Sequence, residues 1–261
     1  IHLHVGRVGQ LNPTAVDFIV QQLPAFTALY YPAIVRLGTD PYGQHVGIAG
    51  QLDLAGISQA VLLAAYTHHT TGYATNRQAE AHLVDERAVT PEGLRRFYGM
   101  ASINLDDAES VEQMSDELAA LESYFRAQPD LFVAIKLANA HQGLPFDHSV
   151  MTAIFGIAAE FGVPVLLHTG FSPFPGTSNE PAYYDPLNLE LAVAANDGQE
   201  GRPLVTFLLS HVGQGDARAQ AHAFDLAESY ENVYLEISAL RGPLQIDAEG
   251  QPMQSSEPQL N

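Results

Sequence analysis

The sequence predicts an α/β fold in which parallel strands alternate with helices. Short apolar runs of strand length recur along the chain, and amphipathic stretches of helical length lie between them. The apolar runs are unbroken, which is typical of parallel strands that are buried on both faces. At 261 residues, 46% of them hydrophobic, the chain is long enough for one large domain with a substantial core.

Seven segments have the length and composition of strands: residues 1–5, 57–65, 97–103, 131–137, 163–168, 204–211 and 233–237. Helices are predicted over residues 76–87, 107–127, 148–161, 187–195 and 217–229. A repeated strand–helix order gives a parallel sheet, and seven strands are one short of a TIM-type (β/α)₈ barrel. We therefore predict a single barrel domain over residues 1–261, with the eighth strand and the following helices missing from this chain.

Two long irregular segments interrupt this order and are expected to be functional. Residues 24–50, after the first strand, and residues 171–186, after the fifth, are rich in Pro, Gly and aromatic side chains. In barrels, loops at the C-terminal ends of the strands build the active site. The polar tail after residue 242 contains Asp247 but no apolar run that could form a last strand. An open barrel is therefore expected, with a gap between the first and seventh strands.

Composition argues against several classes of function. The formal charge is −19, from 11 Lys and Arg against 30 Asp and Glu, so a nucleic-acid partner is not expected. The chain has no Cys, which excludes disulfides and thiolate metal ligands. No apolar run approaches the roughly 20 residues of a membrane span, and no signal-peptide pattern precedes the first strand. We expect a small-molecule substrate and no membrane partner, with the cytoplasm slightly favoured and homo-oligomerisation left open.

The histidines are the most informative feature of the sequence. His2 and His4 flank Leu3 on one predicted strand, so period-two alternation places both imidazoles on one face, where they could chelate an ion. His168 ends the fifth predicted strand and His211 ends the sixth. Lys136 lies in the buried fourth strand, where its ammonium needs a carboxylate partner, a metal-bridging modification or a catalytic role. We predict that these side chains meet at the C-terminal rim of the barrel.

Other side chains are weaker candidates for contact with a substrate. His68 and His69 follow the second predicted strand and His141 follows the fourth, although their positions favour solvated loop residues over substrate contacts. Tyr183 and Arg241 could bind an anionic or aromatic substrate, and Glu236 could orient an imidazole from behind. The remaining histidines are predicted to lie on the surface: His45, His82, His148 and His222.

Taken in order, these motifs resemble the amidohydrolase superfamily. The matching segments are His-Leu-His at residues 2–4, Lys136, PVLLHTG at 164–170, SHVG at 210–213 and NVYLEIS at 232–238. The resemblance covers essentially the whole chain and is closest to the amidohydrolase-related (amidohydrolase 2) group, which contains metal-dependent hydrolases and decarboxylases.

The resemblance implies roles for several residues. His2, His4 and His168 would be metal ligands. His211 would be a further ligand in a dinuclear site, or would polarise substrate or move protons in a mononuclear one. Lys136 matches the position that is carboxylated to bridge two metals in some members. An Asp at the end of strand eight would complete the ligand set.

Together these observations predict a metal-dependent hydrolase. A divalent metal, zinc with manganese as the alternative and one or two ions, would activate water to attack a C–N or C–O bond of a small carboxylated or cyclic substrate. Two alternatives remain open: a metal-dependent non-oxidative decarboxylase of the same family, and a catalytically inactive barrel that serves as a binding module.

Overall fold

The computed structural model describes residues 2–4, 8–25, 27–28, 30, 41–105 and 111–238. Its centre is a seven-stranded sheet in the order β1-β2-β5-β6-β7-β8-β9, in which every neighbouring pair is parallel. The strands are β1 (His2–His4), β2 (Ala60–Leu63), β5 (Phe97–Ala101), β6 (Phe132–Leu137), β7 (Val165–His168), β8 (Phe207–Ser210) and β9 (Val233–Glu236). Spatial order follows chain order, as in a barrel wall, and β1 and β9 are the edges of the described sheet. Within the described ranges, the prediction of seven parallel strands in barrel order, with β1 and β9 unpaired to each other, is therefore confirmed.

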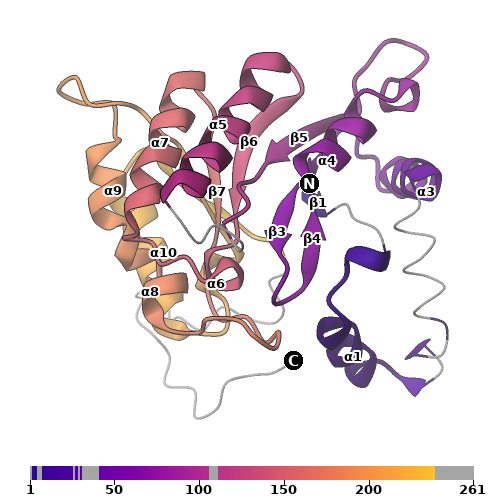
Figure 1. Ribbon diagram of the computed structural model, residues 1–261, viewed down its shortest axis with the longest axis horizontal. Coiled ribbons are helices and arrows are strands. Elements are labelled where there is room, and N and C mark those ends of the chain that lie inside the picture. The colour runs from indigo at the N-terminus through magenta and orange to yellow at the C-terminus, as the bar shows by residue number, and fades with distance from the viewer. Residues whose placement is uncertain are drawn as a thin grey trace.

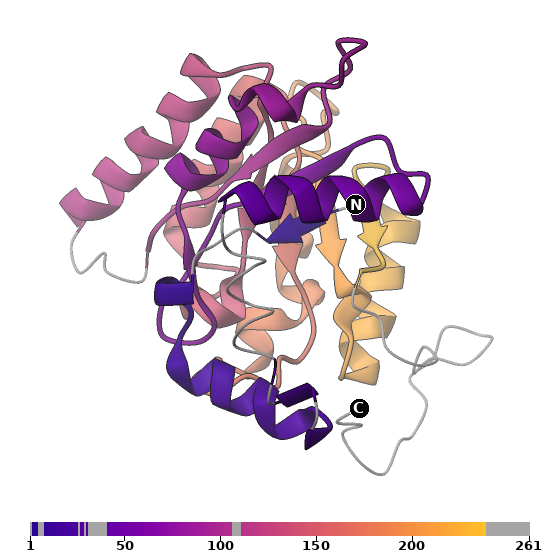
Figure 2. The same cartoon turned by 90° about the vertical axis from the view of Figure 1, so that its right-hand side faces the viewer.

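Helices cover the outside of this sheet. The longer ones are α1 (Pro13–Gln22), α3 (Pro41–Leu54), α4 (Asn76–Leu83), α5 (Val111–Ala127), α7 (Ser149–Phe161), α9 (Glu190–Ala195) and α10 (Ala217–Ser229). Figure 1 shows α5, α7, α9 and α10 grouped on one side of the sheet, and Figure 2 shows α1 and α3 on the side that carries β1. None of the helices within the described ranges has the length and apolar character that crossing a bilayer requires.

Strand periodicity divides the apolar side chains into two layers. Phe97, Ile135, Leu167 and Phe207 belong to the large core between the sheet and the helices. The alternate positions Leu63, Met100, Ala134 and Leu166 form a separate small cluster on the inner face of the sheet. Because both faces are covered, both sets are apolar, which explains why the strands read as unbroken apolar runs.

Three predictions about local structure were wrong. The run 57–65 is not one strand: β2 ends at Leu63, and Ala65–Thr67 (β3) pairs antiparallel with Gly72–Ala74 (β4) in an unpredicted hairpin. Helix α3 begins inside the segment 24–50 that was expected to be irregular; Gly47 and Gly50 lower its intrinsic helix propensity. The predicted helix over 187–195 is divided into a 3₁₀ turn, η3 (Pro186–Leu189), and the short helix α9.

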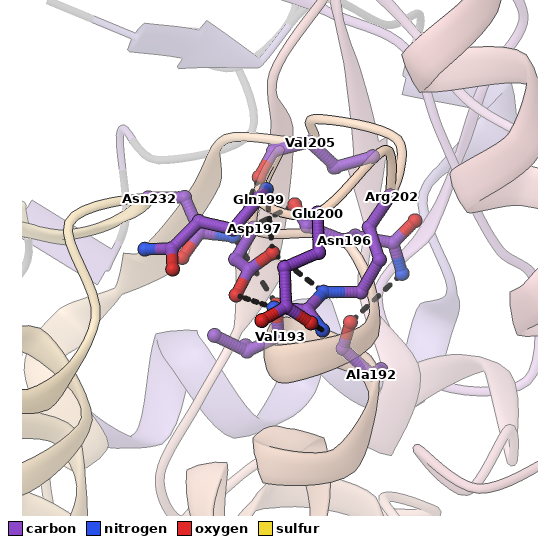
Figure 3. Close-up of polar contacts among 9 residues, drawn as sticks. All are labelled: Ala192, Val193, Asn196, Asp197, Gln199, Glu200, Arg202, Val205 and Asn232. Carbon is purple, nitrogen blue, oxygen red and sulfur yellow. Dashed lines mark hydrogen bonds and ion pairs between the residues drawn. The ribbon is translucent and has the colours of Figure 1, made fainter.

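A polar loop fixes the chain just before β8. The Asn232 side-chain amide donates to the carbonyls of Val193, Asn196 and Val205 at 3.3, 3.0 and 3.0 Å (Figure 3). Arg202 forms a bidentate ion pair with Asp197, in which both guanidinium N to carboxylate O distances are 2.8 Å. These contacts lie at the N-terminal end of the strands, where barrels carry stability and not catalysis.

Short elements gather at the opposite end of the sheet. The turn α6 (Asn139–Gln142) follows β6, and α8 (Pro181–Tyr184) lies in the long loop after β7. Helix α6 contacts β3, β7 and α8, so the hairpin β3–β4 and this loop meet above the C-terminal strand ends (Figure 1). This end of the barrel is where active sites are built.

Candidate active site

Two of the predicted site histidines lie side by side. His168 is the last residue of β7, and His211 begins the 3₁₀ turn η4 (His211–Gly213) directly after β8. The two strands pair with His168 opposite Ser210, which brings the imidazole centroids to 4.9 Å at an interplanar angle of 67°. The two rings are adjacent because β7 and β8 are neighbouring parallel strands and each is completed by a histidine at the same end.

A buried threonine joins the two turns that carry these histidines. Thr169 Oγ1 donates to the Ser210 carbonyl at 2.6 Å and accepts from the Gly213 backbone N–H at 3.0 Å. The backbones of the two turns are also in close contact at Gly170, whose φ is 89°. A Cβ at this position would lie 2.4 Å from Gln214 N and O. Thr169 and Gly170 thus fix the turn after β7 against the turn after β8, and with it the spacing of His168 and His211.

The turn at His211 is strained. His211 and Val212 both have positive φ, 67° and 50°, a conformation that β-branched residues such as valine rarely adopt. Such a conformation costs of order 1–3 kcal/mol per residue and persists only when the surroundings enforce it. Strain of this kind clusters at functional sites, and here it lies at the residue predicted to act on substrate.

The environment of His211 determines which of its ring nitrogens carries hydrogen. His211 Nδ1 lies 2.7 Å from the Ser238 carbonyl, which can only accept, so Nδ1 is the protonated nitrogen. Ser238 is itself anchored to Glu236, whose carboxylate accepts from its backbone N–H at 3.0 Å and its hydroxyl at 2.7 Å. The neutral ring therefore keeps its lone pair on Nε2, the nitrogen that can bind a metal or a proton.

Lys136 is buried within β6, as predicted. Its ammonium lies 3.5 Å from Ser210 Oγ, and its side chain is 3% exposed. Burial lowers the pKa of Lys136 to about 8, although the negative charge of Glu236 opposes this shift. Glu236 thus acts on Lys136 electrostatically, and the three predicted roles of Lys136 (a carboxylate partner, a metal-bridging modification or a catalytic group) stay predictions.

His141 adjoins the same group, although it was predicted only as a weak candidate for contact with a substrate. Its ring lies 5.0 Å from that of His168, edge-on at 86°, and 6.1 Å from that of Phe174 in the long loop. Its Nδ1 lies 2.9 Å from Thr70 Oγ1 in the hairpin turn. Burial, with smaller contributions from Lys136 and His211, lowers the pKa of His141 to about 4, so its ring is neutral near pH 7.

The other predicted substrate contacts are placed less centrally. The His68 ring packs against Tyr73 at 4.2 Å in the hairpin, and His69 is exposed at its tip. Tyr183 packs against Ala140, Tyr184 and Ala219 on the flank of α8. The neighbours of His68 and Tyr183 thus belong to the β3–β4 hairpin and to the surroundings of α8. Arg241 and Asp247 lie outside the described residues.

The remaining histidines were predicted to lie on the surface. His82 was predicted to lie on the surface, but it is buried in the last turn of α4; this prediction was wrong, because the helix presents that position to β5. His148 and His222 are half-buried: His148 caps α7 and His222 pairs with Asp185 at 2.8 Å. The side chain of His45 lies outside the described part of the chain.

The proposed ligands on β1 can be located only by their backbone. His2 pairs in register with Val61 and His4 with Leu63, whose side chains lie on the inner face of the sheet. The side chains of His2 and His4 are outside the described part of the structure. Within the described ranges, no group of three or more His, Cys, Asp or Glu side chains could hold a metal ion. His168 and His211 therefore supply nitrogen donors of a type that suits zinc or manganese, without forming a complete ligand set among the described residues.

The parallel sheet and the histidines at the C-terminal ends of its strands are typical of enzymes built on a (β/α)₈ barrel. A sequence model of the Amidohydrolase family matches residues 1–256, so the chain belongs to that family, whose members include metal-dependent hydrolases and decarboxylases. A search of proteins with curated functions finds no match.

Solved structures agree on the fold. The chain is similar to an uncharacterised TIM-barrel protein of Bordetella bronchiseptica, at 15% identity over 91% of this chain and 75% of that one, with a TM-score of 0.56. It is also similar to a probable 2-pyrone-4,6-dicarboxylic acid hydrolase of Acinetobacter baumannii with citric acid bound. That likeness has 14% identity over 91% of this chain and 68% of that one, with a TM-score of 0.52. At these identities the likeness shows a shared barrel and leaves the substrate to be argued from the site.

Proposed function

We propose that the chain hydrolyses a C–N or C–O bond in a small carboxylated or cyclic substrate at the C-terminal rim of its barrel. The observation that carries this proposal is the His168–His211 pair, with centroids 4.9 Å apart and their turns joined through Thr169. A divalent metal, zinc in our proposal, would be held by His168 with His2 and His4, and would supply an activated water and an electrophile for the substrate carbonyl.

His211 is the proposed proton-transfer residue. Its Nδ1–H is committed to the Ser238 carbonyl, so Nε2 is the nitrogen that accepts a proton from the attacking water and returns it to the leaving group. Glu236, which holds Ser238 through two hydrogen bonds, places a negative charge behind the ring. That charge stabilises the imidazolium that forms when His211 is protonated.

Lys136 is proposed to balance negative charge that develops on the substrate. With a pKa of about 8, it is mainly an ammonium at neutral pH, and the inner face of the barrel keeps it away from water. A carboxylated Lys136 that bridges two metals is the dinuclear alternative, and the metal content of the protein separates the two.

Decarboxylation is the second candidate, because the same residues suit it. The buried ammonium of Lys136 near the neutral His141 ring attracts a substrate carboxylate, and a protonated His211 can deliver a proton to the carbon that loses CO₂. Hydrolysis is the lead since His211 is oriented with an accepting Nε2, which a water nucleophile requires.

The test is turnover by protein reconstituted with zinc or manganese, against panels of amides, lactones and aromatic acids. Proton release with cleavage products supports hydrolysis, whereas CO₂ release from an aromatic acid replaces it with the second candidate. His211→Ala should abolish the signal, and the matched control His222→Gln, on α10 and outside the site, should keep it. No turnover of any panel member with a full complement of metal would refute both candidates and favour the binding module.

A further inference from the structure

The long loop after β7 has a tip that is held in shape by its own hydrogen bonds. At the base, the Asn179 side-chain amide donates to the Ser172 carbonyl at 2.8 Å, and its oxygen accepts from the Ser172 backbone N–H at 3.2 Å. At the tip, the Thr177 hydroxyl donates to the Phe174 carbonyl at 2.6 Å. Residues 172–179 therefore form a closed loop that fixes where Phe174 lies.

Two further contacts fix this tip between neighbouring elements of the rim. The Ser178 backbone N–H donates to the Ala140 carbonyl in α6 at 2.8 Å. Gly176, whose φ is 83°, lies so close to the β3–β4 hairpin that a Cβ there would be 2.8 Å from the His69 carbonyl oxygen. The tip is thus held between the turn after β6 and the hairpin after β2, at the end of the barrel where active sites are built.

Phe174 belongs to a row of rings that starts at the site histidines. Its ring centroid lies 6.1 Å from that of His141, whose own ring is 5.0 Å from that of His168. It also packs against Phe18 of α1, with centroids 5.5 Å apart at an interplanar angle of 58°. The row therefore changes from nitrogen donors and acceptors at one end to hydrocarbon at the other.

Two segments far apart in the sequence supply this hydrocarbon. Phe18 is on α1, whose N-cap residue Asn12 donates its side-chain amide to the His68 carbonyl at 2.9 Å, and Phe174 is on the loop after β7. Both phenyl rings are half-buried, so each keeps some accessible surface. A phenyl ring offers no hydrogen bond to compensate a polar group that leaves water, whereas a second ring packs favourably against it.

We propose that Phe174 is a specificity-determining residue that forms the apolar end of the substrate site, against which the substrate places a hydrocarbon ring remote from the bond that is cleaved. This inference rests on the proposed function for the location of the site and adds what the far end of the substrate is made of. A substrate with a charged group at that end would be a poor ligand, because Phe174 and Phe18 cannot replace its hydration.

Two probes test this without knowledge of the substrate. 3-Phenylpropionate and succinate share one carboxylate and its two-carbon chain, and differ in whether a phenyl ring or a second carboxylate is at the far end. In calorimetric titrations of the zinc-reconstituted protein, the wild type should bind 3-phenylpropionate more tightly than succinate. Phe174→Ala should weaken 3-phenylpropionate binding about 10-fold and leave succinate binding within about 2-fold.

A reversed preference is the result that a merely structural role for Phe174 would not produce. In Phe174→Arg the aliphatic part of the new side chain can still pack at the rim, and its charge should make succinate the tighter ligand. The matched control is Phe161→Leu beside Phe174→Leu. Phe161 is on α7 and stacks on Phe125 at 5.6 Å, so its variant should bind both probes like the wild type. A wild type that does not bind 3-phenylpropionate, or equal losses for both probes in Phe174→Ala, would overturn the proposal.

The substrate found by the panels gives the last measurement. With a substrate that has a hydrocarbon ring at its far end, Phe174→Ala should raise KM about 10-fold and change kcat by less than about 3-fold, because the contact is made in the ground state and the transition state alike. Turnover with an unchanged KM in Phe174→Ala would overturn this proposal and leave the proposed function standing. If no panel member turns over but Phe174→Arg reverses the probe preference, the proposed function fails while the assignment of Phe174 stands.

Discussion

Thr169→Val should separate the two turns that hold the site and cost the protein measurable stability. Valine matches threonine in shape, so packing is kept and only the hydroxyl is lost. That hydroxyl makes two buried hydrogen bonds, to the Ser210 carbonyl at 2.6 Å and from the Gly213 N–H at 3.0 Å. Losing the bond to the Ser210 carbonyl costs about 1 kcal/mol, and leaving the buried Gly213 N–H without its partner costs about 1–3 kcal/mol. The expected loss in the free energy of unfolding is therefore about 3 kcal/mol.

Urea unfolding followed by circular dichroism measures this loss, provided that the m-value is unchanged between the variants. Thr169→Ser keeps the hydroxyl and is the matched control, with an expected loss of no more than about 1 kcal/mol from the missing methyl group. Thr169→Val should also lower turnover more than Thr169→Ser, since the spacing of His168 and His211 depends on this contact. A valine variant within about 0.5 kcal/mol of the wild type would refute the reasoning.

Three further predictions concern single side chains. Asn232→Leu removes three hydrogen bonds to carbonyls and should lower the free energy of unfolding by about 3 kcal/mol, whereas Asn188→Leu, an exposed residue with two such bonds, should change it by less than about 1 kcal/mol in the same urea assay. Lys136 has a pKa of about 8 in the folded protein, below that of an unfolded lysine, so the unfolded state binds more protons above pH 8. The unfolding free energy of the metal-free protein should therefore rise by up to about 3 kcal/mol from pH 8 to pH 10.5, and a Lys136→Met variant that keeps this slope would contradict the assignment. His211→Ala should leave the metal-to-protein ratio nearly unchanged in elemental analysis if the site is mononuclear, whereas loss of about half the metal would indicate a dinuclear site.

The parallel sheet was predictable because its cause is local. Strands buried on both faces must be apolar throughout, and β6, β7 and β8 satisfy this at nearly the predicted bounds. The hairpin β3–β4 was missed for the same reason. Its first strand continues the apolar run of β2, so composition showed no boundary at Ala64 where the chain changes direction. Only the backbone pairing of β3 with β4, in which Thr67 lies opposite Gly72, distinguishes β3 from β2.

The site histidines also differ in how well the sequence could place them. His168 and His211 could be placed from the sequence because each ends an apolar strand, and neighbouring parallel strands end at one rim. His141 could not be placed with equal weight, because it follows its strand by four residues and its direction depends on the α6 turn. The signal that could have found it is Gln142, a buried amide that fixes this turn through two hydrogen bonds.

His141, His168 and His211 place three imidazole rings next to one another at one rim, with the two outer rings held by different groups. Each of the two outer rings is oriented by its Nδ1: Thr70 from the β3–β4 hairpin at one end, and the Ser238 carbonyl after β9 at the other. Because a carbonyl can only accept, Ser238 leaves the Nε2 of a neutral His211 ring as an acceptor. A hydrolase needs such an acceptor to take a proton from water, so moving the Ser238 carbonyl away from His211 Nδ1 should impair catalysis even with every histidine in place.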